Sequence, residues 1–320
     1  MLSILLVIIG FLLLFLGGEL LVRGSVALAI RIRISTLVVG MTVVSFATSS
    51  PEIFVSIKAL YQGSSDIIFG NVIGSNIANI ALVLALTALI FKVNISELTM
   101  KVNYPALMFS SVLLGIVFYF FNGIPQFFGY VFLVGIILFS YLLIKKSHSN
   151  YYESTHEDSD LINTARDFSL FKMILFLCLG VLALKYGADK LVEGTVLIAQ
   201  SLGVSERIIA VSVVAIGTSI PELATSLIAA FKKEDSLAIG NLIGSNIFNI
   251  LVVLGVVSAI RTVNIDDTAI FTFDYILMLG ITLVLGLFVY LNSTKIISRK
   301  EGAVLLILYI LYMYKTISLV

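Results

Sequence analysis

The sequence predicts an all-α polytopic membrane protein with ten transmembrane helices arranged as two inverted five-helix repeats. Three observations lead to this fold class. The 320 residues are 59% hydrophobic and only 12% charged, unlike the composition of a soluble domain. Runs of Leu, Ile, Val and Phe recur at lengths of about 20 residues, which suit a helix that crosses a bilayer. The second half of the chain also repeats a pattern of the first, 170 residues later.

Polar breaks divide the chain into ten expected spans. The first span begins near the N-terminus, where the basic residues of a signal peptide are lacking, so we expect it to be retained. The spans are expected at residues 2–30, 35–61, 67–91, 104–121, 125–144, 170–200, 205–231, 236–260, 270–291 and 302–318.

The longest polar segment, residues 145–167, separates spans five and six. It contains both histidines, His148 and His156, and we expect a flexible linker with these side chains in solvent rather than on a metal. The chain therefore divides into a first inverted repeat at 1–144, a cytoplasmic linker at 145–169 and a second inverted repeat at 170–320.

The distribution of lysine and arginine predicts the orientation of the spans. With the N-terminus outside, the inward loops and helix ends hold far more basic residues than the outward ones. The inward residues are Arg31, Arg33, Lys92, Lys101, Lys145, Lys146, Arg166, Lys172, Lys232, Lys233, Lys295, Arg299 and Lys300, and the outward ones are Arg207, Arg261 and Lys315. This favours a multi-pass cell-membrane protein with both termini outside and the central linker in the cytoplasm.

The internal repeat aligns residues 17–86 with residues 187–256 without a gap, and 26 of the 70 aligned pairs are identical. The identities concentrate in two motifs, T-S-x-P-E and G-N-x-I-G-S-N-I-x-N-I, which both lie inside apolar spans. Five spans per repeat is an odd number, so the two copies must cross the membrane in opposite directions. In secondary transporters with this plan, the substrate site lies near the bilayer midplane between the repeats.

Each repeat places one glutamate in the middle of an apolar span. A charge at the bilayer centre costs at least about 2.5–3.5 kcal/mol, so Glu52 and Glu222 must face a cavity or a partner. No Lys or Arg lies at a similar depth in spans two, three, seven and eight. The structural alternative to a transported cation is an ion pair with Arg23, Lys185 or Lys190 in spans one and six.

A proline precedes each glutamate. Pro51 and Pro221 have no N–H, so the carbonyls of Ala47 and Gly217, four residues earlier, lose their helical partners. Freed carbonyls at membrane depth are tolerated where they line a cavity, and they are good ligands for hard cations. A kink without function is the alternative.

Polar side chains surround each glutamate at helical spacing, so that they share helix faces. The first repeat has Ser45, Thr48, Ser49, Ser56, Asn71, Ser75 and Asn79, and the second has Thr218, Ser219, Ser226, Asn241, Ser245 and Asn249. A stripe of small residues alone would indicate helix packing. Together with a carboxylate, a proline and amides, it favours an oxygen-lined cation site. Oxygen donors without His or Cys suit Na⁺, Ca²⁺, Mg²⁺ or Mn²⁺, and a dry cage with two carboxylates favours Ca²⁺.

These paired motifs resemble the alpha-repeats of the calcium/cation antiporter superfamily, most closely the prokaryotic sodium/calcium exchangers. The resemblance covers essentially the whole chain and implies four ion positions at the membrane centre. It also implies that spans one and six slide as a gating pair over the other eight. The implied Ca²⁺ ligands are Glu52, Glu222, Thr48 and Thr218, and the implied Na⁺ or central ligands are Ser45, Ser49, Ser75, Asn79, Ala215, Ser219, Ser245 and Asn249.

Two features depart from the family pattern. Asn249 stands where members often carry aspartate, which leaves the Na⁺ stoichiometry and the involvement of protons open. The first motif has Ala47 in place of the usual glycine and Ser50 in place of the usual apolar residue.

The resemblance implies a secondary active antiporter that exchanges Ca²⁺ for Na⁺ by alternating access. A Ca²⁺/H⁺ antiporter is an alternative because buried carboxylates can carry protons, and a cation channel is another because carboxylates also line pores. An intramembrane hydrolase is disfavoured, since there is no H-E-x-x-H motif and neither histidine lies in a span.

The expected protein is therefore not an enzyme and has no prosthetic group. Its expected partners are Ca²⁺ and Na⁺ ions and the lipid bilayer. A net charge of +1 gives no indication of a nucleic-acid partner, and no obligate protein partner is evident. The single cysteine, Cys178, is expected to be a buried structural thiol.

Overall fold

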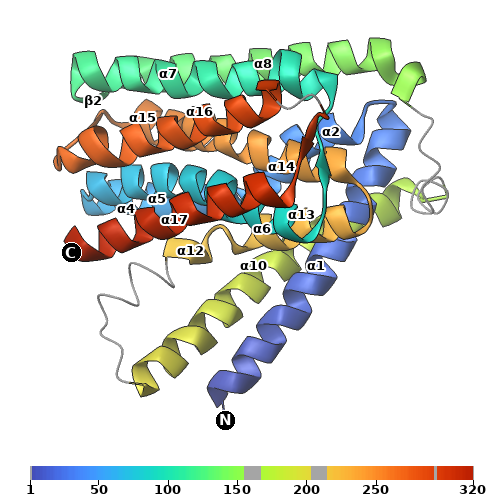
Figure 1. The fold of residues 1–320 in the computed structure, drawn as a ribbon, viewed down its shortest axis with the longest axis horizontal. Coiled ribbons are helices and arrows are strands. Elements are labelled where there is room, and N and C mark those ends of the chain that lie inside the picture. The colour runs from blue at the N-terminus through green and yellow to red at the C-terminus, as the bar shows by residue number, and fades with distance from the viewer. Residues whose placement is uncertain (1, 155–166, 203–214, 292–293, 320) are drawn as a thin grey trace.

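A computed structural model describes residues 2–154, 167–202, 215–291 and 294–319, and its architecture is helical (Figure 1). In this described part of the chain, five short π-helical turns, labelled η, lie within the spans or begin them. The first half contains α1 (Leu2–Ile32), α2 (Thr36–Val39), η1 (Gly40–Val44), α3 (Ser45–Thr48), α4 (Ser50–Gln62), α5 (Ser65–Ala78), η2 (Asn79–Leu84), α6 (Ala85–Ile90), β1 (Val93–Asn94), η3 (Thr99–Asn103), α7 (Tyr104–Phe121), β2 (Gly123–Ile124) and α8 (Gln126–Ser154).

The second half contains elements of the same kinds in nearly the same order. They are α10 (Leu170–Ser201), α12 (Ala215–Gly217), α13 (Ile220–Phe231), α14 (Asp235–Phe248), η5 (Asn249–Val253), α15 (Leu254–Ile260), β3 (Val263–Asn264), η6 (Ile270–Tyr275), α16 (Ile276–Leu291), β4 (Ile296–Ile297) and α17 (Arg299–Leu319). Of the described residues, eight helices are long and apolar enough to cross a membrane.

The two remaining expected spans are the ones that carry the glutamates. Thr36–Thr48 and Ser50–Gln62 pass the same test together but are bent by 42° where they meet. Ile220–Phe231 is a shorter apolar helix, and residues 205–214 of its expected span lie outside the described residues. The chain is thus an all-helical polytopic membrane protein, as predicted.

Two sequence-based expectations need correction. Helix α8 continues to Ser154, so the first ten residues of the expected flexible linker are helical, because the apolar run passes into polar residues without a helix breaker. His148 lies in this part of α8, and His156 lies outside the described residues. Cys178 is exposed on α10 rather than buried, since an apolar run in a membrane protein also covers its lipid-facing surface.

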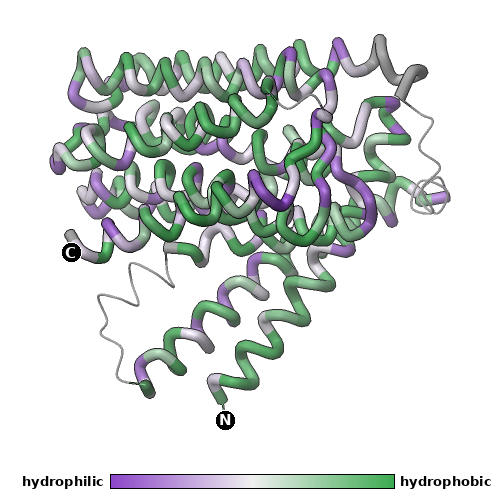
Figure 2. The backbone as a smooth tube through the Cα atoms, viewed as in Figure 1, coloured by the Kyte–Doolittle hydropathy of each residue, from purple (hydrophilic) through white to green (hydrophobic). Residues whose placement is uncertain are grey.

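Hydrophobic residues follow the long helices, including α1 and α10, which lie side by side and project obliquely from the other helices (Figure 2). Large apolar side chains such as Phe11 and Phe15 are more than half exposed. In contrast, the spans Ser65–Ile90 and Asp235–Ile260 are 72% and 78% buried, against 44% or less for the other long spans. These two spans therefore form the centre of the molecule.

Glycines allow α1 and α10 to pack closely. Gly10, Gly17 and Gly24 recur every seven residues, and Gly180, Gly187 and Gly194 repeat them 170 residues later. A Cβ at Gly17 would lie 2.7 Å from the Leu184 nitrogen, and one at Gly187 would lie 2.8 Å from the Leu14 nitrogen. Glycine at such positions lets two backbones approach directly.

The two halves are joined by reciprocal contacts. Strand β1 of the first half pairs antiparallel with β4 of the second, and β3 of the second pairs antiparallel with β2 of the first. The Tyr104 hydroxyl donates to the Thr282 carbonyl at 3.1 Å, and the Tyr275 hydroxyl donates to the Ser111 carbonyl at 3.0 Å. Such an exchange of equivalent contacts is expected of two copies related by a twofold axis.

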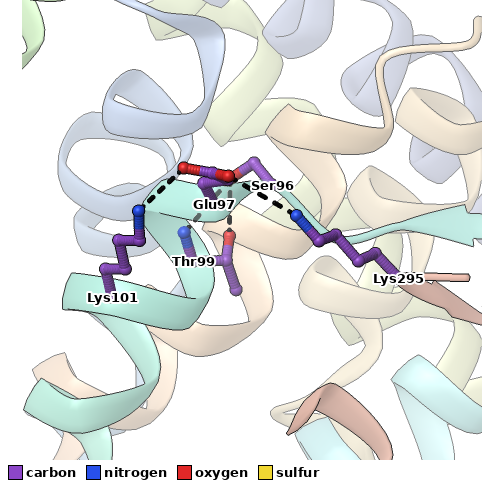
Figure 3. A network of polar contacts seen from close by, with 5 residues as sticks. All are labelled: Ser96, Glu97, Thr99, Lys101 and Lys295. Atoms are coloured by element: carbon purple, nitrogen blue, oxygen red, sulfur yellow. Dashed lines mark hydrogen bonds and ion pairs between the residues drawn. The ribbon is translucent and has the colours of Figure 1, made fainter. Parts of the chain in front are cut away.

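A surface network of polar contacts lies at the β1–β4 end of the molecule (Figure 3). Glu97 lies between Lys101 at 2.9 Å and Lys295 of the second half at 3.5 Å. The hydrogen bond and charge of Lys101, followed by the charge of Lys295, hold the pKa of the Glu97 carboxyl below its ordinary value. Because all three side chains are exposed, we expect the network to contribute little to stability.

We predict that Gly17→Val destabilises the protein by about 1–3 kcal/mol, because the new side chain overlaps the α10 backbone. Thermal unfolding of the detergent-purified protein would measure the loss. Gly135→Val in α8 is the matched control, since no described atom lies within 4 Å of a Cβ at that position. Equal unfolding temperatures for the two variants would contradict close packing of α1 on α10.

Candidate cation site

The span that carries each glutamate is broken at the serine of its T-S-x-P-E motif. Ser49 has φ −85° and ψ 7°, and Ser219 has φ −88° and ψ 0°, so both leave helical geometry in the same way. Pro51 and Pro221 then stand in the first turn of α4 and α13, where a missing N–H costs nothing. The break follows from the proline, and it places Glu52 and Glu222 in the first turn of a new helix.

The carbonyl that Pro51 deprives of a partner is not free, contrary to the expectation. The Ser50 hydroxyl lies 2.9 Å from the Ala47 carbonyl and 2.8 Å from the Phe46 carbonyl. The second copy has Ile220 at the position of Ser50, so it lacks this donor. The serine that departs from the family pattern therefore compensates for the proline in the first half alone.

A cavity of about 40 Å³ lies beside the two breaks. Ala47, Thr48 and Pro51 line it from the first break, and Pro221 lines it from the second. Helix α10 lines another side of the cavity, including through Lys185. The cavity therefore lies between the broken helices and one of the two projecting helices.

Glu52 and Glu222 are buried, with exposed fractions of 1% and 0%. Ser75 lies 3.4 Å from Glu52 Oε1, and the Thr218 hydroxyl of the other half, 3.4 Å from that of Ser75, is also a neighbour of this carboxylate. Ser49 lies 3.3 Å from Glu222 Oε1, and Thr48 and Ser245 complete its hydroxyl neighbours. Each glutamate is thus contacted by residues of both repeats.

The two glutamates lie close enough to repel each other. Among the described residues neither forms an ion pair, so the ion-pair alternative is wrong for Arg23 and Lys190. Arg23 binds Glu19 at 2.6 Å, and Lys190 binds Glu193 at 2.7 Å. Lys185 is exposed on α10 and forms no ion pair with either carboxylate in the described part of the chain.

Several buried oxygens lack a hydrogen-bond partner within the described structure, and two pairs of them occupy equivalent positions of the two repeats. These pairs are the second carboxylate oxygens of Glu52 and Glu222 and the side-chain oxygens of Asn79 and Asn249, and the Ser219 hydroxyl is also without a partner. A buried oxygen without a donor is costly, because it has lost water and gained nothing. Hard cations bind oxygen ligands, so unpartnered oxygens from equivalent positions of the two repeats suit a cation site.

Glycines bring the two repeats together around these oxygens. A Cβ at Gly240 would lie 2.4 Å from the Leu37 carbonyl, and one at Gly244 would lie 2.3 Å from Ser45 Oγ. The Ser45 hydroxyl donates to the Gly40 carbonyl at 2.8 Å and to the Asn241 carbonyl at 2.9 Å. Its side chain therefore joins span two to span eight.

Four asparagines connect spans three and eight at the centre. Asn76 and Asn246, the asparagine pair, each donate to the other's backbone carbonyl at 3.3 and 3.2 Å. Asn79 donates to the Asn246 side-chain oxygen at 3.0 Å, and Asn249 donates to the Asn76 side-chain oxygen at 3.1 Å. Asn79 and Asn249 also begin the π-helical turns η2 and η5, a feature common at functional sites.

The structure thus gathers most of the residues expected from the sequence. Thr48, Ser49, Ser75, Thr218 and Ser245 contact the glutamates or one another. The Thr48 and Ser245 hydroxyls lie 3.4 Å apart, as do those of Ser75 and Thr218. Ala215 begins the short helix α12 just before the second break.

The asparagine pair was missed by the sequence argument. Asn76 and Asn246 are identical in both copies, which was the available signal. They lie outside the i, i+4, i+8 series of polar residues on their helices, so the helical spacing did not include them.

The fold and the site together define a class of protein: a polytopic membrane transporter whose two repeats surround a buried, oxygen-lined, acidic centre. The sequence profile described as "Sodium/calcium exchanger protein" matches residues 2–145 and again residues 172–317. The chain belongs to this family of membrane cation exchangers, and it is a transporter rather than an enzyme.

Relatives match along nearly the whole chain. "Putative antiporter CaxA" of Alkalimonas amylolytica is 37% identical over 98% of both chains. "Inner membrane protein YrbG" of Escherichia coli strain K12 is 32% identical over 91% of this chain and 89% of its own. A solved structure of the sodium-calcium exchanger NCX_Mj superposes with a TM-score of 0.81 at 29% identity, over 98% of both chains.

We predict that Ser50→Ala destabilises the protein by about 1 kcal/mol, because the Ala47 carbonyl loses its donor. Ser110→Ala in α7 is the matched control. Ser110 also donates to the carbonyls three and four residues earlier, both at 3.0 Å, but no proline removes a backbone N–H there. Thermal unfolding of both variants tests the difference, and an equal loss would show that Ser50 does not compensate for Pro51.

Proposed function

We propose that the protein exchanges Ca²⁺ for Na⁺ across the cell membrane by alternating access. The observation that carries this proposal is the pair of buried glutamates, whose second oxygens have no partner among the described residues and whose neighbours are hydroxyls from both repeats. Two carboxylates give a formal charge of −2, which one Ca²⁺ neutralises. Monovalent ions that share the same carboxylates would compete with it, and this competition couples the two fluxes.

The ligand assignment follows the residues that the sequence singled out. Glu52, Glu222 and the backbone oxygens of Thr48 and Thr218 are proposed to hold Ca²⁺. The surrounding hydroxyls, amides and carbonyls are proposed for Na⁺ or the central position: Ser45, Ser49, Ser75, Asn79, Ala215, Ser219, Ser245 and Asn249. Support comes from the contacts of Ser75 with Glu52 and of Ser49 with Glu222.

The domain organisation and orientation are part of the proposal. Each repeat, 1–144 and 170–320, would contribute five spans, and residues 145–169 would connect them in the cytoplasm. Both termini would then lie outside. The excess of basic residues on the inward side supports this orientation.

We expect an outward Na⁺ gradient to drive Ca²⁺ uptake into vesicles that contain the purified protein, with the pH gradient collapsed. The measurement is calcium flux with Na⁺, K⁺ and pH gradients imposed separately. Uptake driven by the pH gradient alone would replace Na⁺ by H⁺ as the coupling ion. Flux that is independent of any ion on the opposite side would instead indicate a channel.

We also expect Glu52→Gln and Glu222→Gln to abolish exchange while the protein still inserts. An amide keeps the shape of the carboxylate but removes one negative charge, so the site no longer neutralises Ca²⁺. Glu97→Gln is the matched control, because Glu97 is exposed and far along the chain from both motifs. Calcium exchange at the unmodified rate in either central variant would refute the assignment.

A further inference from the structure

The asparagine pair is held in one orientation by atoms that can only accept. Asn76 Nδ2 lies 3.3 Å from the Asn246 carbonyl, and Asn246 Nδ2 lies 3.2 Å from the Asn76 carbonyl. Both side chains are 1% exposed, so water does not offer an alternative partner. Because a backbone carbonyl cannot donate, the atom of each amide that faces it must be the NH₂ group.

This orientation determines the next pair of amides. With its NH₂ group committed, each side chain of the asparagine pair turns its oxygen toward a neighbour. Asn249 Nδ2 donates to Asn76 Oδ1 at 3.1 Å, and Asn79 Nδ2 donates to Asn246 Oδ1 at 3.0 Å. The oxygens of Asn79 and Asn249 are then left buried and without a donor among the described residues.

We propose that Asn76 and Asn246 are positioning residues that hold the amide oxygens of Asn249 and Asn79 toward the ion. The central position then presents acceptors only. This inference rests on the proposed Ca²⁺ exchange, and it assigns a role to two residues that do not themselves contact the cation. Asn79 supports the placement, because it follows Ser75 by one helical turn and Ser75 contacts Glu52.

The need for positioning follows from the chemistry of the amide. A carboxamide has a donor end and an acceptor end of nearly the same shape, and it can rotate to present either. The donor end repels a cation, whereas a carboxylate offers an oxygen in both orientations. With asparagine at both 79 and 249, neither central residue can act as a ligand unless its orientation is imposed.

The test is a double-substitution cycle with Ca²⁺ as the only added ion. Calcium binding to the detergent-purified full chain would be measured for Asn76→Leu, Asn249→Asp and both together. We expect Asn76→Leu alone to weaken binding about tenfold or more, as the loss of a residue that orients a metal ligand does. In the Asn249→Asp background the same change should cost less than about twofold, because a carboxylate needs no orientation.

The other half provides the matched control. Asn246 orients Asn79 rather than Asn249, so Asn246→Leu should remain as costly in the Asn249→Asp background as in the unmodified chain. It should be rescued only by Asn79→Asp. A merely structural role for the asparagine pair would give the same cost in every background, and that result would overturn the proposal.

Further measurements distinguish a loss of positioning from misfolding and from a failure of the proposed function. Thermal unfolding identifies variants that fail to fold, and the cycle on Asn246 and Asn79 then tests the same idea independently. Asn76→Ala replaces Asn76→Leu if the larger side chain is not accommodated. An unmodified protein that binds no Ca²⁺ would refute the proposed function, whereas normal binding with additive costs would refute only the positioning role.

Discussion

The burial of two neighbouring carboxylates is the constraint on which the rest of the structure depends. Glu52 and Glu222 are almost completely buried and lie near each other, and no described Lys or Arg pairs with either of them. Burying charge in a medium of low polarity is costly unless the charge is neutralised. On the proposed function, a cation from solution supplies that neutralisation. Because the empty site would hold two uncompensated charges in a medium of low polarity, the site needs to be occupied by a cation whenever it changes its side of access. This requirement couples the two ion fluxes.

The reciprocal contacts between the repeats follow from this constraint. Thr218 of the second repeat contacts Glu52, and Thr48 and Ser49 of the first contact Glu222. Neither repeat alone completes the surroundings of its own glutamate. The same exchange between repeats recurs in the β1–β4 and β2–β3 pairs. A twofold arrangement thus gives the two carboxylates similar environments and places the site between the two repeats.

The sequence predicted the parts of the fold that depend on local chemistry. Apolar run lengths, the prolines and the polar spacing predicted the spans, a disturbed helix before each glutamate, and the gathering of hydroxyls around the glutamates. The structure locates the disturbance as a break at Ser49 and at Ser219. It missed contacts that depend on the three-dimensional geometry of the breaks and of the helix crossings. The donation by Ser50 to the Ala47 carbonyl needs the geometry of the break, and the asparagine pair needs the crossing of α5 and α14. Burial of Cys178 was wrong because hydropathy does not separate lipid-facing from core-facing positions.

Asn79 and Asn249 affect how many cations the proposed site can hold at the same time. Both central amides are neutral, so Glu52 and Glu222 are its only charged ligands. A single Ca²⁺ or two Na⁺ ions would balance them, and a third Na⁺ would leave a buried positive charge. An aspartate in place of Asn249 would accommodate that third ion, or a proton when only two are present. Asn249, which departs from the family pattern, therefore affects the stoichiometry of exchange. It does so because charges in a buried site must balance without screening by water.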